Sequence, residues 1–186
     1  MIKGDKIMVY VFLADGFEII EAMAPIDMLR RANVGVTTVG VDKKVITSSC
    51  GIPVTADIVS NEFEFKDVEA VIIPGGSQGV INLEKSSLVQ SVIDEAVQNG
   101  ILICAICAGP SILGHKGLLK GVSATCYPGF EEALEGAFIS DKYVVADVDF
   151  ITARGAGVSV EFGLAIVKEL VGEEAAETVR STIQCM

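Results

Sequence analysis

The chain has 186 residues, and 25 acidic against 14 basic side chains give it a formal net charge of −11. This length suits one domain, and the charge argues against nucleic acid or an anionic membrane as a partner, because either would require a basic surface. Hydrophobic residues make up 51% of the chain, but only 6% is aromatic and Trp is absent. Such a core of Val, Ile, Leu and Ala is typical of a parallel sheet covered by helices on both faces.

The sequence also lacks the signals of export. No stretch approaches the roughly 18–20 apolar residues of a membrane span, and the first six residues lead into a strand pattern without a signal-peptide layout. Five cysteines are an odd number, and in a chain of this length they do not read as a disulfide framework. We therefore expect a soluble protein of the reducing cytoplasm.

The first third of the chain alternates between strand and helix patterns. The apolar run 6–13 predicts a buried strand, and a turn at Asp15-Gly16 leads into a helix expected over 17–32. A second strand is expected over 34–41. The segment 44–58 is punctuated by Gly and Pro and rich in β-formers, which predicts a hairpin-like excursion.

The alternation continues to the C-terminal end. A strand over 69–74 ends in Gly75-Gly76, and the residues that follow are expected to form a polar loop. The remaining expected elements are a helix over 87–99, a strand over 101–105, a helix from Cys107 to about Gly114, a short strand over 122–124, two or three strands within 137–153, and helices over 157–171 and 173–183.

This order predicts a single domain, residues 1–186, with an α/β fold in which right-handed crossovers build a doubly wound, mostly parallel sheet. Ligands of such sheets bind beyond the carboxyl ends of the strands. Three expected strands end in Asp15-Gly16, Gly75-Gly76 and Ile106-Cys107. We expect these three ends to meet at one rim.

Cys107 is the strongest candidate for a reactive group. It lies between a buried strand and a helix, where a residue projects from a tight and often strained turn. Ala108 and Gly109 are small enough to admit a substrate, and Pro110 is tolerated in a first helical turn. The positive end of the helix dipole would favour the thiolate, so we expect a nucleophile here, although a buried free Cys is also a common packing residue.

Other cysteine chemistries fit less well. Cys104 and Cys107 form a C-x-x-C pair, but Cys104 falls inside the apolar strand rather than at the start of a helix. A zinc site would need four ligands, and the chain has no second such pair and one His. That residue, His115, lies eight residues after Cys107, or roughly 12 Å along a helix. It is expected to interact with the last carbonyls of its helix, so a Cys-His-acid triad is disfavoured.

A carboxylate is left to handle protons. Glu18 and Glu21 both follow the first strand, at the rim where Cys107 should emerge. A carboxyl group buried beside a thiolate would have a raised pKa, stay protonated and act as acid and base in turn. The alternative is that either Glu complements the helix dipole. Gly75, Gly76 and the amide of Ala108 could offer N–H groups to an oxyanion.

Taken together, these segments resemble the ThiJ/PfpI superfamily, and within it the branch of parkinsonism-associated deglycase, over nearly the whole chain. The resemblance implies a flavodoxin-like sandwich of the class I glutamine amidotransferase type, found as a homodimer. The matching segments are 15–22 (DGFEIIEA), 73–76 (IPGG), 105–110 (AICAGP), 152–155 (TARG) and 161–167 (EFGLAIV).

The resemblance also implies roles for single residues. Cys107 would be the reactive, oxidisable cysteine and Glu21, rather than Glu18, its protonated partner. Gly76 and Ala108 would supply oxyanion-hole amides. Arg31 and Arg154 match positions near the dimer interface or the rim of the active site. The protease branch has a His directly after the cysteine, where this chain has Ala108, so protease activity is not expected.

One position departs from the family pattern. The deglycase branch has a His before a Pro opposite the cysteine, whereas this chain reads ATCYP over 124–128. Tyr127 thus stands in the His position, where it can donate a hydrogen bond but is a poor base at neutral pH. Cys126 brings a second sulfur, which could pair with oxidised Cys107 or simply pack in the core.

The leading interpretation is an enzyme without cofactor or metal that acts on reactive α-oxoaldehydes, or on early glycation adducts, as a glyoxalase or deglycase. Cys107 would attack the carbonyl carbon and Glu21 would transfer the proton. Tyr127, in the His position, would be the third catalytic residue. The alternative is a redox sensor or chaperone that is switched by oxidation of Cys107.

Overall fold

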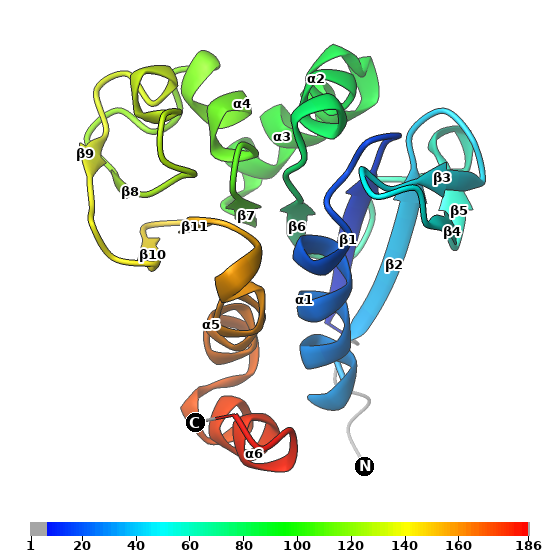
Figure 1. The fold of residues 1–186 in the computed structure, drawn as a ribbon. Helices are drawn as coiled ribbons and strands as arrows, with labels where there is room; N and C mark the ends of the chain where they lie inside the picture. The colour runs from blue at the N-terminus through cyan, green and yellow to red at the C-terminus, as the bar shows by residue number, and fades with distance from the viewer. Residues whose placement is uncertain (1–6, 186) are drawn as a thin grey trace.

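A mixed sheet forms the centre of the molecule in the computed structural model, which describes residues 7–185 (Figure 1). Within that range the sheet has seven strands in the order β10-β11-β7-β6-β1-β2-β5. Neighbouring strands run parallel, except that β10 is antiparallel to β11. The bounds are β1 Met8–Leu13, β2 Gly35–Gly40, β5 Ile58–Val59, β6 Val68–Ile73, β7 Leu102–Ile106, β10 Val144–Asp147 and β11 Phe150–Ala153.

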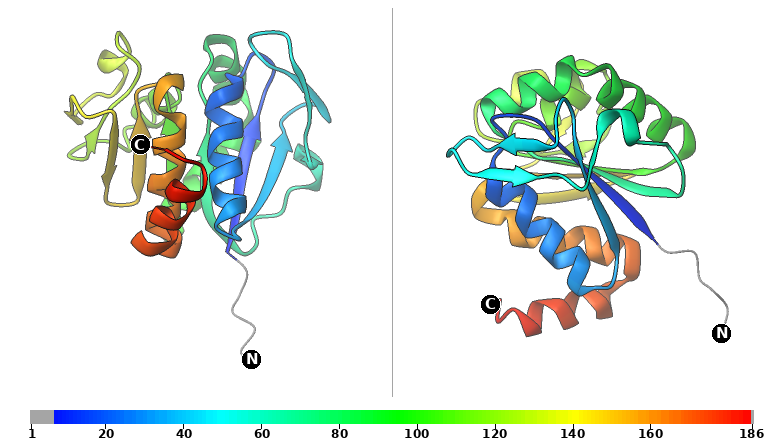
Figure 2. Two further views of the ribbon diagram at one scale, coloured as in Figure 1. Left: turned by 60° about the horizontal axis from the view of Figure 1, so that its bottom comes forward. Right: turned by 90° about the vertical axis from the view of Figure 1, so that its right-hand side faces the viewer.

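Helices cover both faces of this sheet, which makes the fold a flavodoxin-like sandwich (Figure 2). One face carries α1 (Ile19–Arg31), α5 (Ser159–Val171) and α6 (Glu173–Thr182), and the other carries α2 (Ser77–Lys85), α3 (Ser87–Asn99) and α4 (Pro110–His115). The shorter elements are the β3–β4 hairpin (Val45–Thr47 and Pro53–Thr55), the β8–β9 pair (Ser123–Ala124 and Phe138–Ile139) and three 3₁₀ turns, Ser60–Glu62, Glu131–Ala133 and Ala156–Val158.

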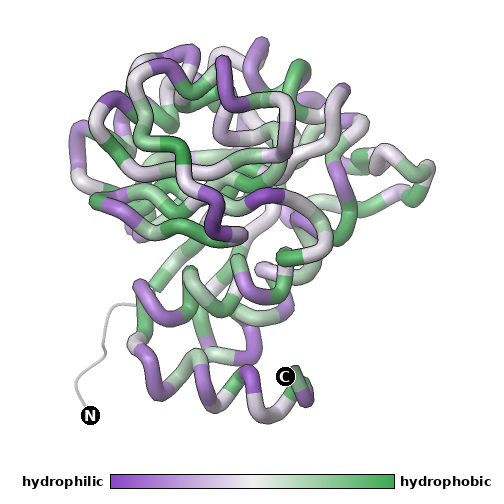
Figure 3. The backbone as a smooth tube through the Cα atoms, turned by 60° about the vertical axis from the view of Figure 1, so that its left-hand side comes forward, coloured by the Kyte–Doolittle hydropathy of each residue, from purple (hydrophilic) through white to green (hydrophobic). Residues whose placement is uncertain are grey.

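The central strand β7 shows why a sheet forms here. All five of its residues are buried, and successive side chains alternate between the two faces. Ile103 and Ala105 pack with α2, α3 and α4, while Cys104 and Ile106 pack with α1 and α5. A strand buried on both sides must be apolar throughout, and hydrophobic residues are indeed concentrated in the inner strands (Figure 3). The predicted doubly wound α/β fold is confirmed.

Two predicted elements differ from the structure. The expected polar loop after Gly76 is the helix α2. The helix expected from Cys107 begins only at Pro110, because Cys107 has a φ of 64°, which a right-handed helix cannot accommodate. The first strand begins at Met8, and Lys6, where it was expected to begin, lies outside the described residues.

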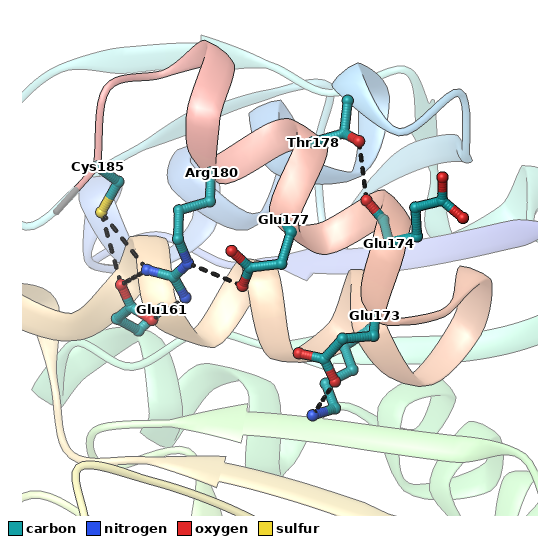
Figure 4. Close-up of polar contacts among 8 residues, drawn as sticks. Glu161, Glu173, Glu174, Glu177, Thr178, Arg180 and Cys185 are labelled. Carbon is teal, nitrogen blue, oxygen red and sulfur yellow. Dashed lines mark hydrogen bonds and ion pairs between the residues drawn. The ribbon is translucent and has the colours of Figure 1, made fainter.

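The last helix packs on the sandwich through the buried Ala176 and Val179, and one arginine adds a polar link to α5. Arg180 of α6 donates two hydrogen bonds to Glu161 of α5, at 2.6 and 2.7 Å, and a third to Glu177 (Figure 4). The Cys185 thiol also contacts the Glu161 carboxylate, at 3.5 Å. None of the helices formed by residues 7–185 is both long and apolar enough to cross a membrane.

Candidate active site

Cys107 occupies a strained turn at the carboxyl end of β7. Its φ of 64° lies in the left-handed region, which costs a residue with a side chain roughly 1–2 kcal/mol. Two backbone hydrogen bonds of 2.8 Å hold it there: its N–H donates to the carbonyl of Ala153, and its carbonyl accepts from the N–H of Tyr127. The strained turn predicted from the sequence is present.

Glu21 lies directly beside this cysteine. It belongs to the first turn of α1, is 1% exposed, and its carboxyl group hydrogen-bonds the Cys107 thiol. The carboxyl also accepts the amides of Gly75, at 2.9 Å, and Ala156. Burial, with a smaller contribution from the charge of Glu18, raises the pKa of Glu21 to about 7.

Glu18 interacts with the start of helix α1, which is the alternative role considered for these two acids. It caps α1, since its carboxylate accepts the Glu21 amide at 2.9 Å.

The cysteine is not the acidic thiol that a helix N-terminus was expected to produce. Burial first, and then the negative charge of Glu21, raise the pKa of the Cys107 thiol to about 12. The amides of Ala108 and Gly76 hydrogen-bond the sulfur and lower this pKa, but by less than burial raises it. The expectation fails because burial and the charge of Glu21 outweigh the two amides.

Glu21 and Cys107 share a hydrogen bond, and each changes the acidity of the other. The pair loses its first proton near pH 7 and its second only near pH 12, so it carries one negative charge between these values. Two amides stabilise that charge on the Glu21 oxygens, and two others stabilise it on the Cys107 sulfur. Glu21 is by far the stronger acid of the two, so the proton that remains on the pair lies on the Cys107 sulfur, and the Glu21 carboxylate can accept it when the sulfur reacts.

The two glycines after β6 serve different partners. A Cβ on Gly75 would collide with a Glu21 carboxyl oxygen and lie 2.6 Å from the Cys107 Cβ, so its amide reaches Glu21 only because it has no side chain. Gly76 has a φ of 93°, and a Cβ there would press on the backbone of Gly16 and Glu18. Its amide points to the sulfur. Of the two predicted oxyanion donors after β6, Gly76 is therefore the one beside the nucleophile, together with Ala108.

Tyr127 and Arg154 lie at the rim of this centre. With Tyr143, Gly155 and Val158 they line a pocket of ≈ 350 Å³. The Tyr127 side chain is half exposed, and its ring carbon Cδ2 is 3.3 Å from the Cβ position of Gly155. That same position is 3.9 Å from a Glu21 carboxyl oxygen, so the pocket adjoins the hydrogen-bonded pair.

Two other predicted residues, Arg31 and Cys126, have environments separate from that of the pair. Arg31 is at the C-terminal end of α1, roughly 15 Å along the axis from Glu21, and its side chain bonds Asp27 at 2.8 Å. The structure does not bring Arg31 to the active-site rim. Cys126 is buried in the core cluster on the α2–α4 face, whereas Cys107 packs on the opposite cluster, and both are free thiols. Their pairing stays a prediction.

His115 does not bond the last carbonyls of its helix as expected. Its Nδ1 lies 2.5 Å from a Glu84 carboxylate oxygen of α2, so this His is engaged on the surface of the α2–α4 face. Within residues 7–185 there is no group of three or more His, Cys, Asp or Glu side chains that could hold a metal ion.

Sequence reasoning missed the contributions of Ala153 and Ala156. Both act through backbone atoms: the carbonyl of Ala153 holds the Cys107 amide, and the amide of Ala156 bonds Glu21. No side-chain pattern could reveal them. The segment TARG (152–155) could have indicated them, because it ends the strand β11 and continues into the turn at the same rim.

Comparison with known proteins identifies this arrangement. Residues 7–169 match the model of the DJ-1/PfpI family. The chain belongs to this family. The identification confirms the predicted membership of the ThiJ/PfpI superfamily and of its parkinsonism-associated branch, because the match to the relatives below extends over nearly their full length.

Three relatives of the DJ-1/PfpI family illustrate the similarity. DJ-1beta of Drosophila melanogaster is 35% identical over 91% of this chain and 92% of its own length, and its crystal structure gives a TM-score of 0.93 over 97% of this chain and 99% of that one. The structure of oxidised DJ-1 from Toxoplasma gondii gives a TM-score of 0.89 at 30% identity, over 96% of this chain and 98% of that one. The glutathione-independent glyoxalase DJR-1.2 of Caenorhabditis elegans is 29% identical over 87% of each chain.

Proposed function

We propose that this chain is a cysteine enzyme of the glyoxalase or deglycase type, which converts reactive α-oxoaldehydes or early glycation adducts without a cofactor. The observation that carries the proposal is the Cys107–Glu21 pair, which loses its first proton near neutral pH. A group of this kind can supply a nucleophile and a proton donor at the same moment. The glyoxalase name of the Caenorhabditis elegans relative agrees with it.

The reaction follows from the positions of the groups. The Glu21 carboxylate takes the thiol proton as the Cys107 sulfur adds to the aldehyde carbon of methylglyoxal, and the oxygen that becomes negative lies beside the amides of Gly76 and Ala108. Glu21 gives this proton to that oxygen, then removes the proton on the former aldehyde carbon and returns it to the neighbouring carbon, while the hydroxyl proton passes to the former ketone oxygen. Water releases the resulting thioester as lactate, so the net change is methylglyoxal plus water to lactate.

Tyr127 is assigned a supporting role in this proposal. Its hydroxyl can donate a hydrogen bond to a substrate oxygen from the pocket rim, but it is a poor base at neutral pH. All proton transfer on carbon is therefore assigned to Glu21.

Methylglyoxal consumption with lactate detection tests the proposal directly. The wild type is compared with Cys107→Ser and Glu21→Gln, each of which should reduce kcat/KM by about a hundredfold or more. Cys50→Ser is the matched control, since Cys50 is an exposed free cysteine on the β3–β4 hairpin loop. Lactate formation that persists in the Cys107→Ser protein would refute the mechanism.

The second candidate function is a redox sensor or chaperone without turnover. The observation that favours it is the ring of donors around the Cys107 sulfur, namely the protonated Glu21 and the amides of Gly76 and Ala108, which suits the oxygens of a sulfinate. A peroxide titration followed by intact-mass analysis separates the two functions. Selective oxidation of Cys107 in a protein that makes no lactate would favour the sensor.

We further propose that the protein is a cytoplasmic homodimer. Exposed apolar side chains on α1 and on the β3–β4 hairpin support an interface there, notably Ile20 and Ile52. The two elements are neighbours, because the amide of Ser49 in the hairpin loop donates to the Phe17 carbonyl just before α1. Sedimentation equilibrium at about micromolar concentration should give twice the mass of one chain.

A further inference from the structure

Arg154 is an arginine without an acidic partner in a chain that has 25 acidic residues. Within the described residues its side chain makes no hydrogen bond and no ion pair. Its guanidinium carbon lies 5.7 Å from the centre of the Tyr143 ring, and its charge opposes the rise in the pKa of the Cys126 thiol. The other arginines bind carboxylates, as Figure 4 shows for one of them. These pairs are Arg30 with Asp57, Arg31 with Asp27, and Arg180 with Glu161.

Arg154 lies in a pocket next to Glu21 and Cys107. It follows β11 directly, and its backbone amide donates to the Tyr143 carbonyl at 3.0 Å. The pocket of ≈ 350 Å³ that it lines is of a size that holds a small molecule. One wall is Gly155, whose Cβ position is 3.9 Å from a Glu21 carboxyl oxygen, and another is Tyr127, whose amide bonds the Cys107 carbonyl.

We propose that this pocket selects carbonyl substrates that carry a carboxylate, with Arg154 as the residue that binds it. This inference rests on the proposed function, which it narrows to α-oxoaldehydes with an acidic tail. The aldehyde end lies at Cys107, the short carbon chain lies against the rings of Tyr127 and Tyr143, and the carboxylate pairs with the guanidinium. The balanced reaction is R–CO–CHO plus water to R–CHOH–COOH, with R bearing the carboxylate.

Two physical arguments support this assignment. A guanidinium group offers parallel N–H donors that match a carboxylate, and stacking on an aromatic ring fixes its plane before the ligand arrives. The second argument is the field of the whole chain, because a net charge of −11 repels an anion from most of the surface. An anionic substrate therefore needs a local cation at the entrance, and no carboxylate of the described residues already occupies Arg154.

The test compares two substrates that differ by one charge, 4,5-dioxopentanoate and its methyl ester. The ratio of their kcat/KM values measures the preference for the carboxylate. We expect the ratio to fall by about tenfold in Arg154→Gln and to recover in part in Arg154→Lys. The matched control is Arg30→Gln, which removes the same charge from the far end of α1. An unchanged ratio in Arg154→Gln would overturn the inference.

A second measurement keeps this inference separate from the proposed function. If the wild type turns over neither substrate, the enzymatic proposal fails, and the Arg154 pocket is then tested by alkylation. Cys107 is labelled with 3-maleimidopropionate, which is charged, and with N-ethylmaleimide, which is neutral, and the labelled peptide is quantified by mass spectrometry. The ratio of the two rates should fall by about fivefold to tenfold in Arg154→Gln. Equal ratios in the two proteins would overturn the inference without any reference to turnover.

Discussion

At the scale of single residues, the hydrogen bond shared by Glu21 and Cys107 is the property from which the others follow. Burial raises the pKa of both groups, and the Glu21 carboxylate beside the thiol is what can take its proton. Four backbone amides offset that effect, two at each group, and all four come from turns at the carboxyl ends of strands. The site therefore depends on backbone positions as much as on its two side chains.

The raised pKa of Glu21 has a measurable effect on stability. This carboxyl has an ordinary pKa of 4.5 when unfolded and of about 7 when folded, so the folded state binds the proton more tightly. The stabilisation is complete below about pH 4.5 and is lost as the pH rises through about 7. Urea unfolding of Glu21→Gln and of the wild type is measured at about pH 5 and about pH 8. Between these values the unfolding free energy of the variant should rise by roughly 2–3 kcal/mol relative to that of the wild type.

The two proteins share all other titrating groups, and Cys107, whose pKa Glu21 raises, has a pKa above this pH range in the folded wild type, so the comparison reports mainly on Glu21. A difference in unfolding free energy that does not change with pH would show that Glu21 titrates normally in the folded protein.

Gly75 should be as sensitive as the side chains that it adjoins. In Gly75→Ala the new methyl group collides with the Glu21 carboxyl and the Cys107 Cβ, which must separate. We expect a loss of about 1–3 kcal/mol in unfolding free energy and a fall of about a hundredfold in kcat/KM with methylglyoxal. Thermal unfolding and initial rates measure the two effects, and full activity in this variant would contradict the tight geometry.

Much of this residue-scale arrangement could be predicted from the sequence. Cys107 was found because an apolar strand, two small residues and a proline follow one another in a short segment. The choice between Glu18 and Glu21 came from the family resemblance, since the spacing of the two acids does not tell which one is buried. The predicted direction of the Cys107 pKa is wrong, because burial and the charge of Glu21, which depend on atoms distant in sequence, outweigh the amides of Gly76 and Ala108.

At the scale of elements, the missed helix α2 shows where local patterns fail. Its sequence, SQGVINLEK, is short and has Gly79 in its first turn, and glycine costs a helix about 1 kcal/mol relative to alanine. The structure requires that glycine, because a Cβ would lie 2.6 Å from the Phe17 Cα. Close contact between α2 and the turn before α1 has therefore removed the signal by which a helix is recognised.

The attachment of α6 through Arg180 yields a prediction for this element. Replacing Arg180 with Gln removes two charged hydrogen bonds to a partly buried carboxylate, so α6 should open more often. Amide exchange in Glu173–Thr182 should become about fivefold faster, equivalent to about 1 kcal/mol. The control is Lys168→Gln, which breaks an exposed ion pair with Glu173 and should change exchange less than twofold. Equal effects of the two variants would contradict the role of Arg180.

At the scale of the whole molecule, charge opposes the proposed assembly. Two copies that each carry a net charge of −11 repel one another, while the apolar contacts that would join them do not depend on salt. The dissociation constant of the dimer should therefore fall as the salt concentration rises from about 0.05 M to about 0.5 M, since the screening length falls severalfold. Sedimentation equilibrium across this range measures it, and a dimer that dissociates with added salt would instead indicate an interface held by ion pairs.

The order of the strands in the sheet has a consequence for how the protein is made. Strand β11 lies directly beside β7 in the sheet, although it is synthesised long after it. The carbonyl of Ala153 at the end of β11 accepts the hydrogen bond of the Cys107 amide. The Ala156 amide on Glu21 comes later still. A growing chain thus exposes its cysteine as an ordinary thiol until about five-sixths of its length has been translated, because contacts so distant in sequence form late in folding. The arrangement of Cys107 and Glu21 therefore forms only after β11 and the turn at Ala156 have joined the fold.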